Sequence, residues 1–510
     1  MSDSPKTTVM GPRHVRGSTL LLAGRGFSLL FNMATQVIVV RTLSKTEFGA
    51  FAYALALTAA GRTVLSLGQG KLLSRFMAKY EEDRDYGRMF GSMALAAGTI
   101  LVTSGVLIAG LFLFADELAG TAVDDPRAIH VLLVLAFLAP MEALDEVFVS
   151  IFAVFSRPGS IFFRKNLLTP VLRLAVVVGL FAVGGGALSL AVGYVATGAV
   201  GLLVYVLLFS RILQERGLRG HFRPRGLVLP YKSVFSFSFP TLTSELVWLS
   251  MHAASVTILG FHRGVAEVAG YRAVLPAARL NSLVFTAFVT LFLPMASRLF
   301  ARGEYDELRE AYWHTAIFLA VFTFPVFALT GPFAEQATVT LFGQRYAGSA
   351  PILALLAVGY YVNAALGFNA YTIQIFGRLR VVVAINVAVA IVNLVLCLVL
   401  VPRFGALGVA FANGAAFILL NLLNQAALAR CMRSGLVDRR YVRAYLVIVA
   451  AALLLWLVQQ AFEPGIVVAV TVTVIVWAAV LLLTQRWLRL EESFPELARI
   501  PLVRRVFRQR

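Results

Sequence analysis

A small set of charged residues stands inside long apolar stretches of this chain, and these residues carry most of its chemical information. They are Arg25, Arg62, Arg173, Arg272 and Arg279, together with Glu142, Asp145, Glu146 and Glu245. A charged side chain at the centre of a bilayer costs at least ~2.5 kcal/mol by insertion scales. Such residues therefore pair with one another, face water or bind a ligand.

Two of the arginines belong to polar stripes. The residues at helical spacing around Arg25 are Ser28, Asn32 and Gln36, and those around Arg62 are Thr58, Ser66 and Gln69. A one-sided polar stripe on an apolar helix faces away from lipid. We expect these stripes to contact a polar substrate through Asn32, Gln36, Ser66 and Gln69.

The acids have candidate basic partners at matching depth. Glu146 and Arg173 lie within one helical turn of each other in depth, which predicts a structural ion pair between two helices. Glu142 and Asp145 add more acid than these neighbours can neutralise, so one of the acids would be protonated or bind a cation. Glu245 lies between the depths of Arg272 and Arg279. Glu245, Glu142 and Glu146 are the candidates for ion coupling.

Four arginines exceed the acids near them. Only Glu245 is an evident acidic partner for Arg25, Arg62, Arg272 and Arg279. Because a guanidinium matches phosphate bidentately, this surplus predicts an anionic, phosphate-bearing ligand. The alternative is that these arginines serve helix packing or extend to the membrane surface, Arg62 above all.

Composition identifies the elements that hold these residues. The chain has 510 residues, of which 59% are hydrophobic and 14% charged, and its mean hydropathy is +0.82. Soluble domains carry about 25% charged residues, and barrel strands would alternate over only ~10 residues. The apolar blocks are instead long enough for spanning helices, which need ~20 residues. The sequence therefore predicts an all-α integral membrane protein and excludes a soluble domain.

Reading for apolar blocks gives fourteen transmembrane helices. They are 18–40, 48–67, 89–114, 131–155, 167–183, 188–209, 233–259, 266–296, 312–331, 350–376, 381–401, 407–429, 444–462 and 466–485. With this assignment, 34 of the 45 Lys and Arg residues fall on one side and 6 on the other. Because cytoplasmic loops carry the excess of Lys and Arg, both termini are predicted to be cytoplasmic. The net charge of +19 then reflects orientation and attraction to membrane lipids, and not nucleic-acid binding.

An internal repeat organises these helices. A shift of 220 residues aligns Glu47–Phe51 with Glu267–Tyr271 and Asn166 with Asn386, and a shift of 219 aligns Gly186 with Gly405. We expect two pseudo-symmetric six-helix lobes plus two C-terminal helices, with the substrate site between the lobes. The expected parts are a cytoplasmic N-tail 1–17, an N-lobe 18–209, a basic linker 210–232, a C-lobe 233–429, the last two helices with their preceding loop 430–485 and a basic C-tail 486–510.

Several function classes are excluded by what the loops contain. The loops assigned to the outside are too short for a catalytic domain, and no Gly-rich phosphate loop with a following Lys and Ser/Thr is present. Asp83-Arg84-Asp85 has the letters of a nucleotide-sugar motif but lies in a short charged loop. We therefore interpret the chain as a secondary transporter and not an enzyme, with no metal and no cofactor apart from a coupling H⁺ or Na⁺.

Certain stretches resemble a known family. They are Arg25–Ser28, Arg41–Gly49, Leu341–Ala347, Ala350–Leu353 and Pro402–Gly408. In them the chain resembles the polysaccharide transporter, or Wzx-type, flippases of lipid-linked oligosaccharides. These belong to the multidrug, oligosaccharidyl-lipid and polysaccharide exporter superfamily.

The resemblance implies a bacterial inner-membrane protein that works by alternating access. Its implied cargo is an undecaprenyl-diphosphate-linked oligosaccharide, moved from the cytoplasmic to the outer leaflet for surface polysaccharide biosynthesis. By likeness to the sister peptidoglycan-precursor flippases, the residues implied to meet the diphosphate are Arg25, Arg62, Arg272 and Arg279. Expected partners are membrane lipids, a polysaccharide polymerase and chain-length machinery. Two alternatives stay open, a peptidoglycan-precursor flippase and a cation-coupled multidrug exporter of the same superfamily.

Overall fold

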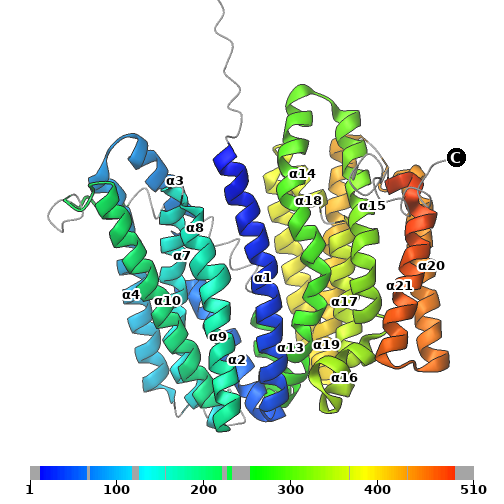
Figure 1. Ribbon diagram of the computed structural model, residues 1–510, viewed down its shortest axis with the longest axis horizontal. Helices are drawn as coiled ribbons and strands as arrows, with labels where there is room; N and C mark the ends of the chain where they lie inside the picture. The colour runs from blue at the N-terminus through cyan, green and yellow to red at the C-terminus, as the bar shows by residue number, and fades with distance from the viewer. Residues whose placement is uncertain are drawn as a thin grey trace, which may run out of the picture. The chain divides into compact units, whose positions relative to one another are not determined.

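The computed structural model describes residues 12–65, 69–115, 117, 126–155, 157–220, 227–231, 253–366, 368–433 and 435–488. Within these residues the secondary structure is helical, and no strand is present. The chain divides into two compact units, Met1–Ala266 and Glu267–Arg510. In each unit the long helices run side by side along a common direction (Figure 1). The predicted all-α class is confirmed.

Unit 1 contains the first group of helices. Their bounds are α1 Pro12–Thr42, α2 Lys45–Leu65, α3 Gln69–Glu82, α4 Tyr86–Leu113, α6 Pro126–Ala136, α7 Leu138–Val154, α8 Pro158–Ile161, a π-helix η1 Phe162–Leu168, α9 Thr169–Val183, α10 Ala187–Glu215 and α12 Ser255–Arg263. In this unit α2 packs against α6 and α7, α1 against α9, and α10 against α7 and α9.

Local sequence signals begin and end several of these helices. Ser44 and Glu47 form a capping box before α2, in which the Ser44 N–H donates to Glu47 Oε2 (3.1 Å) and the Glu47 N–H donates to Ser44 Oγ (3.2 Å). The Asp85 carboxylate accepts from the Arg88 N–H at the start of α4 (3.0 Å). Gly184, at φ 64°, ends α9 in the left-handed conformation that glycine adopts without strain.

The core of unit 1 is aromatic and lies where α3, α4, α7 and α10 meet. Phe148, Phe152, Tyr205 and Phe209 contact one another with ring centroids 5.0 to 6.2 Å apart. Burial of such side chains gives the unit a hydrophobic core of its own.

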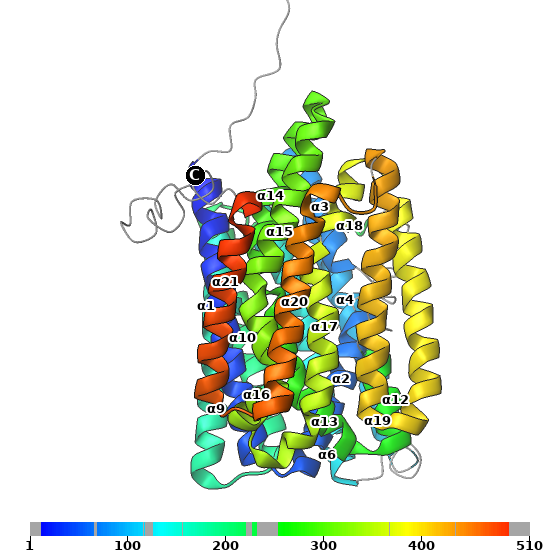
Figure 2. The ribbon, with the colours of Figure 1, turned by 90° about the vertical axis from the view of Figure 1, so that its right-hand side faces the viewer.

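Unit 2 contains the second group, of which α13 Val265–Arg279 begins at the boundary between the units. The others are a 3₁₀ turn η4 Leu280–Ser282, α14 Leu283–Arg302, α15 Tyr305–Thr330, α16 Ala334–Phe342, a 3₁₀ segment η5 Gln344–Ser349, α17 Ala350–Leu366, α18 Phe368–Ile375, α19 Leu379–Met432, α20 Arg439–Phe462 and α21 Ile466–Leu488. The long α19 consists of two helices (Figure 2). They meet at Gly405, whose φ of 55° and ψ of −132° are not helical.

The core of unit 2 is built around α15. This helix packs against α14, α17, α20 and α21, and its buried side chains include Tyr312, Trp313 and Phe324. The Trp477 Nε1–H of α21 donates to the Val321 carbonyl (3.0 Å), and a His314 ring nitrogen of α15 lies 2.8 Å from the Leu488 carbonyl. The last helix, α21, is thereby fixed to the core of this unit.

Eight described helices are long and apolar enough to cross a membrane. Their outward faces carry large exposed apolar side chains, such as Val102 and Leu113 on α4 and Val467 on α21, as expected for contact with hydrocarbon. Of the fourteen expected spans, 233–259 lies mostly outside the described residues, and each of the others falls on described helices. The spans 381–401 and 407–429 together form the element α19. The count of fourteen stays a prediction.

Matching contacts in the two units agree with the internal repeat. In unit 1, Glu47 Oε1 lies so close to Gly186, the N-cap of α10, that a Cβ there would be 2.8 Å away. In unit 2, the equivalent Glu267 accepts from the Ala406 N–H (3.0 Å), where the second half of α19 begins. Equivalent residues thus join equivalent helices, whereas the symmetric six-helix lobes stay a prediction. The expected boundary near residue 232 lies outside the described residues.

Candidate functional site

A polar cavity of about 240 Å³ lies inside unit 1. It is lined from α1, α2, α7, η1, α9 and α10, and its charged members are Arg62, Glu142, Asp145, Glu146, Arg164, Lys165 and Arg173. Four basic and three acidic groups therefore share one space among helices whose other faces are apolar. Ionised groups at such a depth are stable only when paired or hydrated.

The half-exposed part of this cavity is an ion-pair network. Arg62 Nη1 of α2 lies 3.4 Å from Glu146 Oε1 and 3.8 Å from Glu142 Oε2. Arg173 Nη2 of α9 donates to Glu142 Oε1 (3.2 Å), and its guanidinium carbon lies 4.8 Å from the centre of the Tyr194 ring. Glu142 thus bridges two arginines from different helices.

The inner part of the cavity holds a buried ion pair. Arg164 Nη1, on the π-helix η1, pairs with Asp145 Oδ2 of α7, and both residues are buried. The Arg164 guanidinium also lies 4.9 Å from the centre of the Tyr205 ring. Gly201 on α10 permits this approach, because a Cβ there would be 2.6 Å from Arg164 Nη2.

This network corrects three predictions. The predicted pair between Glu146 and Arg173 is wrong: Arg173 lies level with Glu142, one turn along α7, and Glu146 pairs with Arg62. The predicted excess of acid is wrong because Arg164 supplies a further cation. Arg62 has acidic partners, so it is neither an unpaired cation nor directed to the membrane surface.

Arg164 is absent from the site residues predicted from the sequence, and the reason is the predicted start of the fifth span. The apolar pattern begins the fifth span at residue 167 and therefore predicts that Arg164 and Lys165 lie in a cytoplasmic loop. In the structure the helical segment begins at Pro158, and η1 turns the Arg164 side chain inward. Proline is favoured in the first turn of a helix, so Pro158 is the sequence signal that could have placed the start of this segment earlier.

Other predicted site residues of unit 1 have different outcomes. Asn32 lines the polar cavity and its amide donates to Ser28 Oγ (3.1 Å), whereas Gln36 is half-buried on α1. The residues that lie outside the described residues, or whose side chains do, are Arg25, Ser66, Gln69 and Glu245. Among the described residues, no group of three or more His, Cys, Asp or Glu side chains could hold a metal ion.

The predicted arginine pair of unit 2 lies on α13. Arg279 has an exposed side chain whose Nε donates to the Tyr360 hydroxyl of α17 (3.3 Å). Arg272 is half-buried, and its electrostatic neighbours include Arg279, Tyr271 and Tyr360. The Tyr271 hydroxyl accepts from the Asn413 amide (2.9 Å). In the described part of the chain, Arg279 is bonded to a phenol and forms no ion pair.

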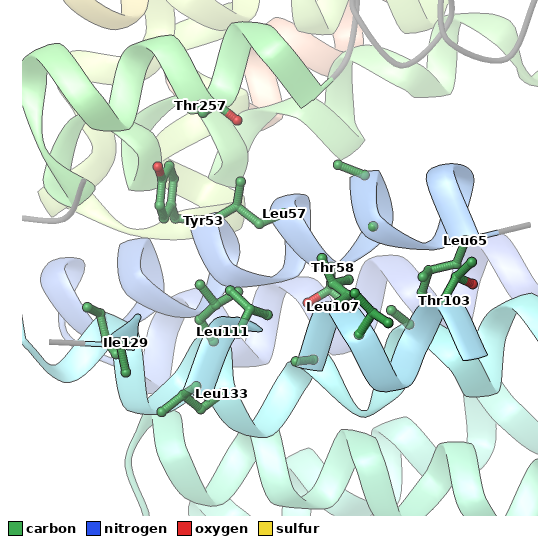
Figure 3. Close-up of a pocket in the computed structure, with 17 residues that line it drawn as sticks. Tyr53, Leu57, Thr58, Leu65, Thr103, Leu107, Leu111, Ile129, Leu133 and Thr257 are labelled. Atoms are coloured by element: carbon green, nitrogen blue, oxygen red, sulfur yellow. The ribbon is translucent and has the colours of Figure 1, made fainter. Parts of the chain in front are cut away.

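An apolar cavity of about 580 Å³ was not predicted from the sequence. It lies in unit 1 between α2, α4, α6 and α12, and the labelled residues around it include Tyr53, Leu57, Thr103, Leu107 and Thr257 (Figure 3). Apolar residues at lipid-facing and cavity-facing positions look alike in sequence, so only the packing of these helices reveals the space.

Comparison with known proteins now identifies the family. Residues 38–351 match the family model described as polysaccharide biosynthesis protein. The chain belongs to this family. The predicted resemblance is therefore confirmed, and the chain is a multi-pass membrane protein of a transport family.

Two relatives bear names of the same kind. The succinoglycan biosynthesis transport protein ExoT of Rhizobium meliloti (strain 1021) is 25% identical over 356 residues, which are 68% of this chain and 65% of ExoT. The match thus spans slightly less than two thirds of ExoT. Stage V sporulation protein B of Bacillus subtilis (strain 168) is 20% identical over 526 residues, covering 96% of this chain and 98% of that protein.

Solved structures show the same fold. The lipid II flippase MurJ, in an inward closed conformation, has a TM-score of 0.71 at 14% identity, over 91% of this chain and 99% of that chain. An inward-facing MATE family multidrug resistance transporter of the MOP superfamily has a TM-score of 0.64 at 15% identity, over 80% and 96% of the two chains. At these identities the likeness shows the fold alone, and it is a transporter fold.

Proposed function

We propose that this protein moves an undecaprenyl-diphosphate-linked oligosaccharide from the cytoplasmic to the outer leaflet of the bacterial inner membrane by alternating access. The glycan head cannot cross hydrocarbon unaided, because each buried polar group without a partner costs several kcal/mol in order of magnitude. The polyprenyl tail, in contrast, stays in lipid while the head passes through the protein. Membership of the polysaccharide biosynthesis family supports this cargo.

Arg279 is the observation that carries the proposal. Arg279 is an exposed residue, and within the described residues its guanidinium meets the Tyr360 hydroxyl and no carboxylate. An arginine without an acidic partner retains donors for a bidentate contact with a phosphate.

The alternatives are less well supported. A peptidoglycan-precursor flippase would share the diphosphate and the fold, but the likeness to MurJ extends to 14% identity only. A multidrug exporter needs an acid-dominated interior to hold a cationic drug, and the polar cavity of unit 1 contains more basic than acidic groups. The proposed oligosaccharide also agrees with the name of ExoT.

Substitution of Arg279 tests the proposal. In a deletion strain complemented with Arg279→Ala, we expect surface polysaccharide to fall about 10-fold or more, since a hydrogen bond to a charged group contributes ~1.5–3 kcal/mol. Arg279→Lys should be intermediate, because lysine keeps the charge and loses the fork of donors. Surface glycan and accumulated lipid-linked sugar are measured together.

The matched control is Arg298→Ala, which removes an exposed arginine of α14. It should complement fully at an equal amount of membrane-inserted protein. Normal surface glycan from Arg279→Ala would overturn the phosphate contact, and an unaltered lipid-linked sugar pool in the deletion strain would overturn the cargo.

A further inference from the structure

A second basic site lies in unit 2, away from α13. A pocket of about 460 Å³ is lined by Glu310 of α15, by Arg439, Arg440, Tyr441 and Arg443 of α20, and by Arg486 and Trp487 of α21. We call it the arginine pocket. Its lining residues lie where α20 begins and α21 ends. These helix ends lie at the end of this unit where α14 turns into α15 (Figure 2).

The floor of the arginine pocket is held by packing between its three helices. The Trp313 and Tyr441 rings stack with centroids 6.2 Å apart and an interplanar angle of 17°. A His314 ring nitrogen lies 2.8 Å from the Leu488 carbonyl at the end of α21. The arginines are therefore presented by a fixed surface and not by a loop.

Three of the four arginines of this pocket have no carboxylate partner within the described part of the chain. Arg440 is held by the N-cap residue Asp438, to which it donates from Nη2 (2.9 Å) and from its backbone N–H (3.0 Å). Glu310 acts electrostatically on the same Arg440. Arg439, Arg443 and Arg486 are exposed and form no ion pair or hydrogen bond within the described part of the chain. One lining carboxylate and three guanidinium groups without a carboxylate partner leave the pocket with a surplus of positive charge.

Apolar side chains continue from this surface along the same two helices. Leu446 on α20 is 60% exposed and Leu483 on α21 is 61% exposed, each within one turn of Arg443 or Arg486. Trp487 beside them is a residue of the type that lies at the membrane interface. A phosphate bound by the arginines would thus be followed, at the adjacent depth, by a surface for hydrocarbon chains. A free phosphate would contact only the arginines.

We propose that the arginine pocket binds the phosphate of an anionic phospholipid. Basic pockets between membrane helices on the cytoplasmic side bind lipid head groups, and this end of α20 and α21 is predicted to be cytoplasmic. The site is separate from Arg279 and from the proposed transport of the oligosaccharide. It would make the position of the two C-terminal helices sensitive to the charge of the surrounding lipid.

The test compares lipid binding by the full-length protein with and without two of the arginines. Wild type and Arg443→Gln/Arg486→Gln are purified and titrated with dioleoyl-phosphatidylglycerol, dioleoyl-phosphatidylcholine and inorganic phosphate, and bound lipid is measured by native mass spectrometry. We expect wild type to prefer phosphatidylglycerol, and the double variant to bind it roughly 30-fold more weakly, the loss expected for two arginines at an anionic surface.

Two further variants keep the test decisive. Arg211→Gln/Arg298→Gln removes two exposed arginines that do not line the arginine pocket, and it should bind phosphatidylglycerol as wild type does. Arg443→Lys/Arg486→Lys should restore part of the binding and reports on the site if the Gln variant does not fold. Equal binding of phosphatidylglycerol by wild type and the Gln variant would overturn the proposal. So would displacement of the lipid by equimolar inorganic phosphate, which would assign the pocket to a soluble anion.

Discussion

Two arginines of the polar cavity depend on their partners to different degrees. Arg164 and Asp145 are both buried, so the loss of one leaves the other without its ion-pair partner in a medium of low dielectric. Arg173 is about one quarter exposed, and its partner Glu142 retains Arg62 when Arg173 is removed. We therefore expect the pair of Arg164 and Asp145 to be essential for stability and the pair of Arg173 and Glu142 to be partly redundant.

This difference predicts unequal effects of two similar substitutions. Arg164→Ala should destabilise the protein by about 3–5 kcal/mol, because it leaves Asp145 buried and unpaired. Arg173→Ala should cost about 1 kcal/mol, the value of a partly exposed pair. The melting temperature of the purified protein in detergent measures both.

A double substitution distinguishes the ion pair from simple loss of packing. Arg164→Met/Asp145→Leu removes both charges and fills the space, so it should recover much of the stability lost in Arg164→Ala. A double variant as unstable as Arg164→Ala would show that the pair is not the cause.

Among the elements, η1 decides the geometry of the cavity. This π-helix extends the segment that contains α9 backwards to Pro158 and places Arg164 against α10. Single π-turns within helices are uncommon, and many of those that occur lie at functional sites. The approach of η1 to α10 depends on the absence of a side chain at Gly201, where a Cβ would be 2.6 Å from Arg164 Nη2.

Gly201→Ala should therefore be destabilising, although alanine is the better helix former. The new methyl group would push the guanidinium away from Asp145 and overpack the cavity, at a cost of about 1–3 kcal/mol. Gly179→Ala on α9 is the matched control, because nothing lies within 4 Å of a Cβ at that position. It should leave the melting temperature unchanged or raise it slightly. Equal melting temperatures for the two variants would contradict the close approach of η1 to α10.

At the scale of the whole molecule, each unit has its own hydrophobic core, with aromatic side chains of α7 and α10 in unit 1 and with α15 at the centre of unit 2. Alternating access requires bodies of this kind, which keep their internal packing while the access to a bound head group changes. The matching contacts of Glu47 and Glu267 agree with an origin of the two bodies by duplication.

The proposed transport moves charge, so it should respond to the membrane potential. When no cation accompanies the diphosphate, the membrane potential changes the free energy of its export by ~2.3 kcal/mol per charge per 100 mV. In proteoliposomes, an inside-negative potential set with valinomycin should speed outward movement of a fluorescent lipid-linked oligosaccharide, and the opposite potential should slow it. Exposure of the label to an added quencher measures the rate. No response to either polarity would show that a cation moves with the substrate.

The sequence alone determined the membrane environment, the helical class and the family, because these depend on the length of apolar blocks, the positions of Lys and Arg, and short motifs along the chain. It also identified Glu142, Glu146 and Arg173 as a related group and Arg62 as a charge within the membrane, since a charge inside an apolar helix is visible without coordinates. Only the tertiary structure decided which of them pair, because helix rotation and a π-turn shift a side chain by a full turn relative to a count along the sequence. For the same reason Arg164, the apolar cavity and the arginine pocket emerged only when distant helices were placed side by side.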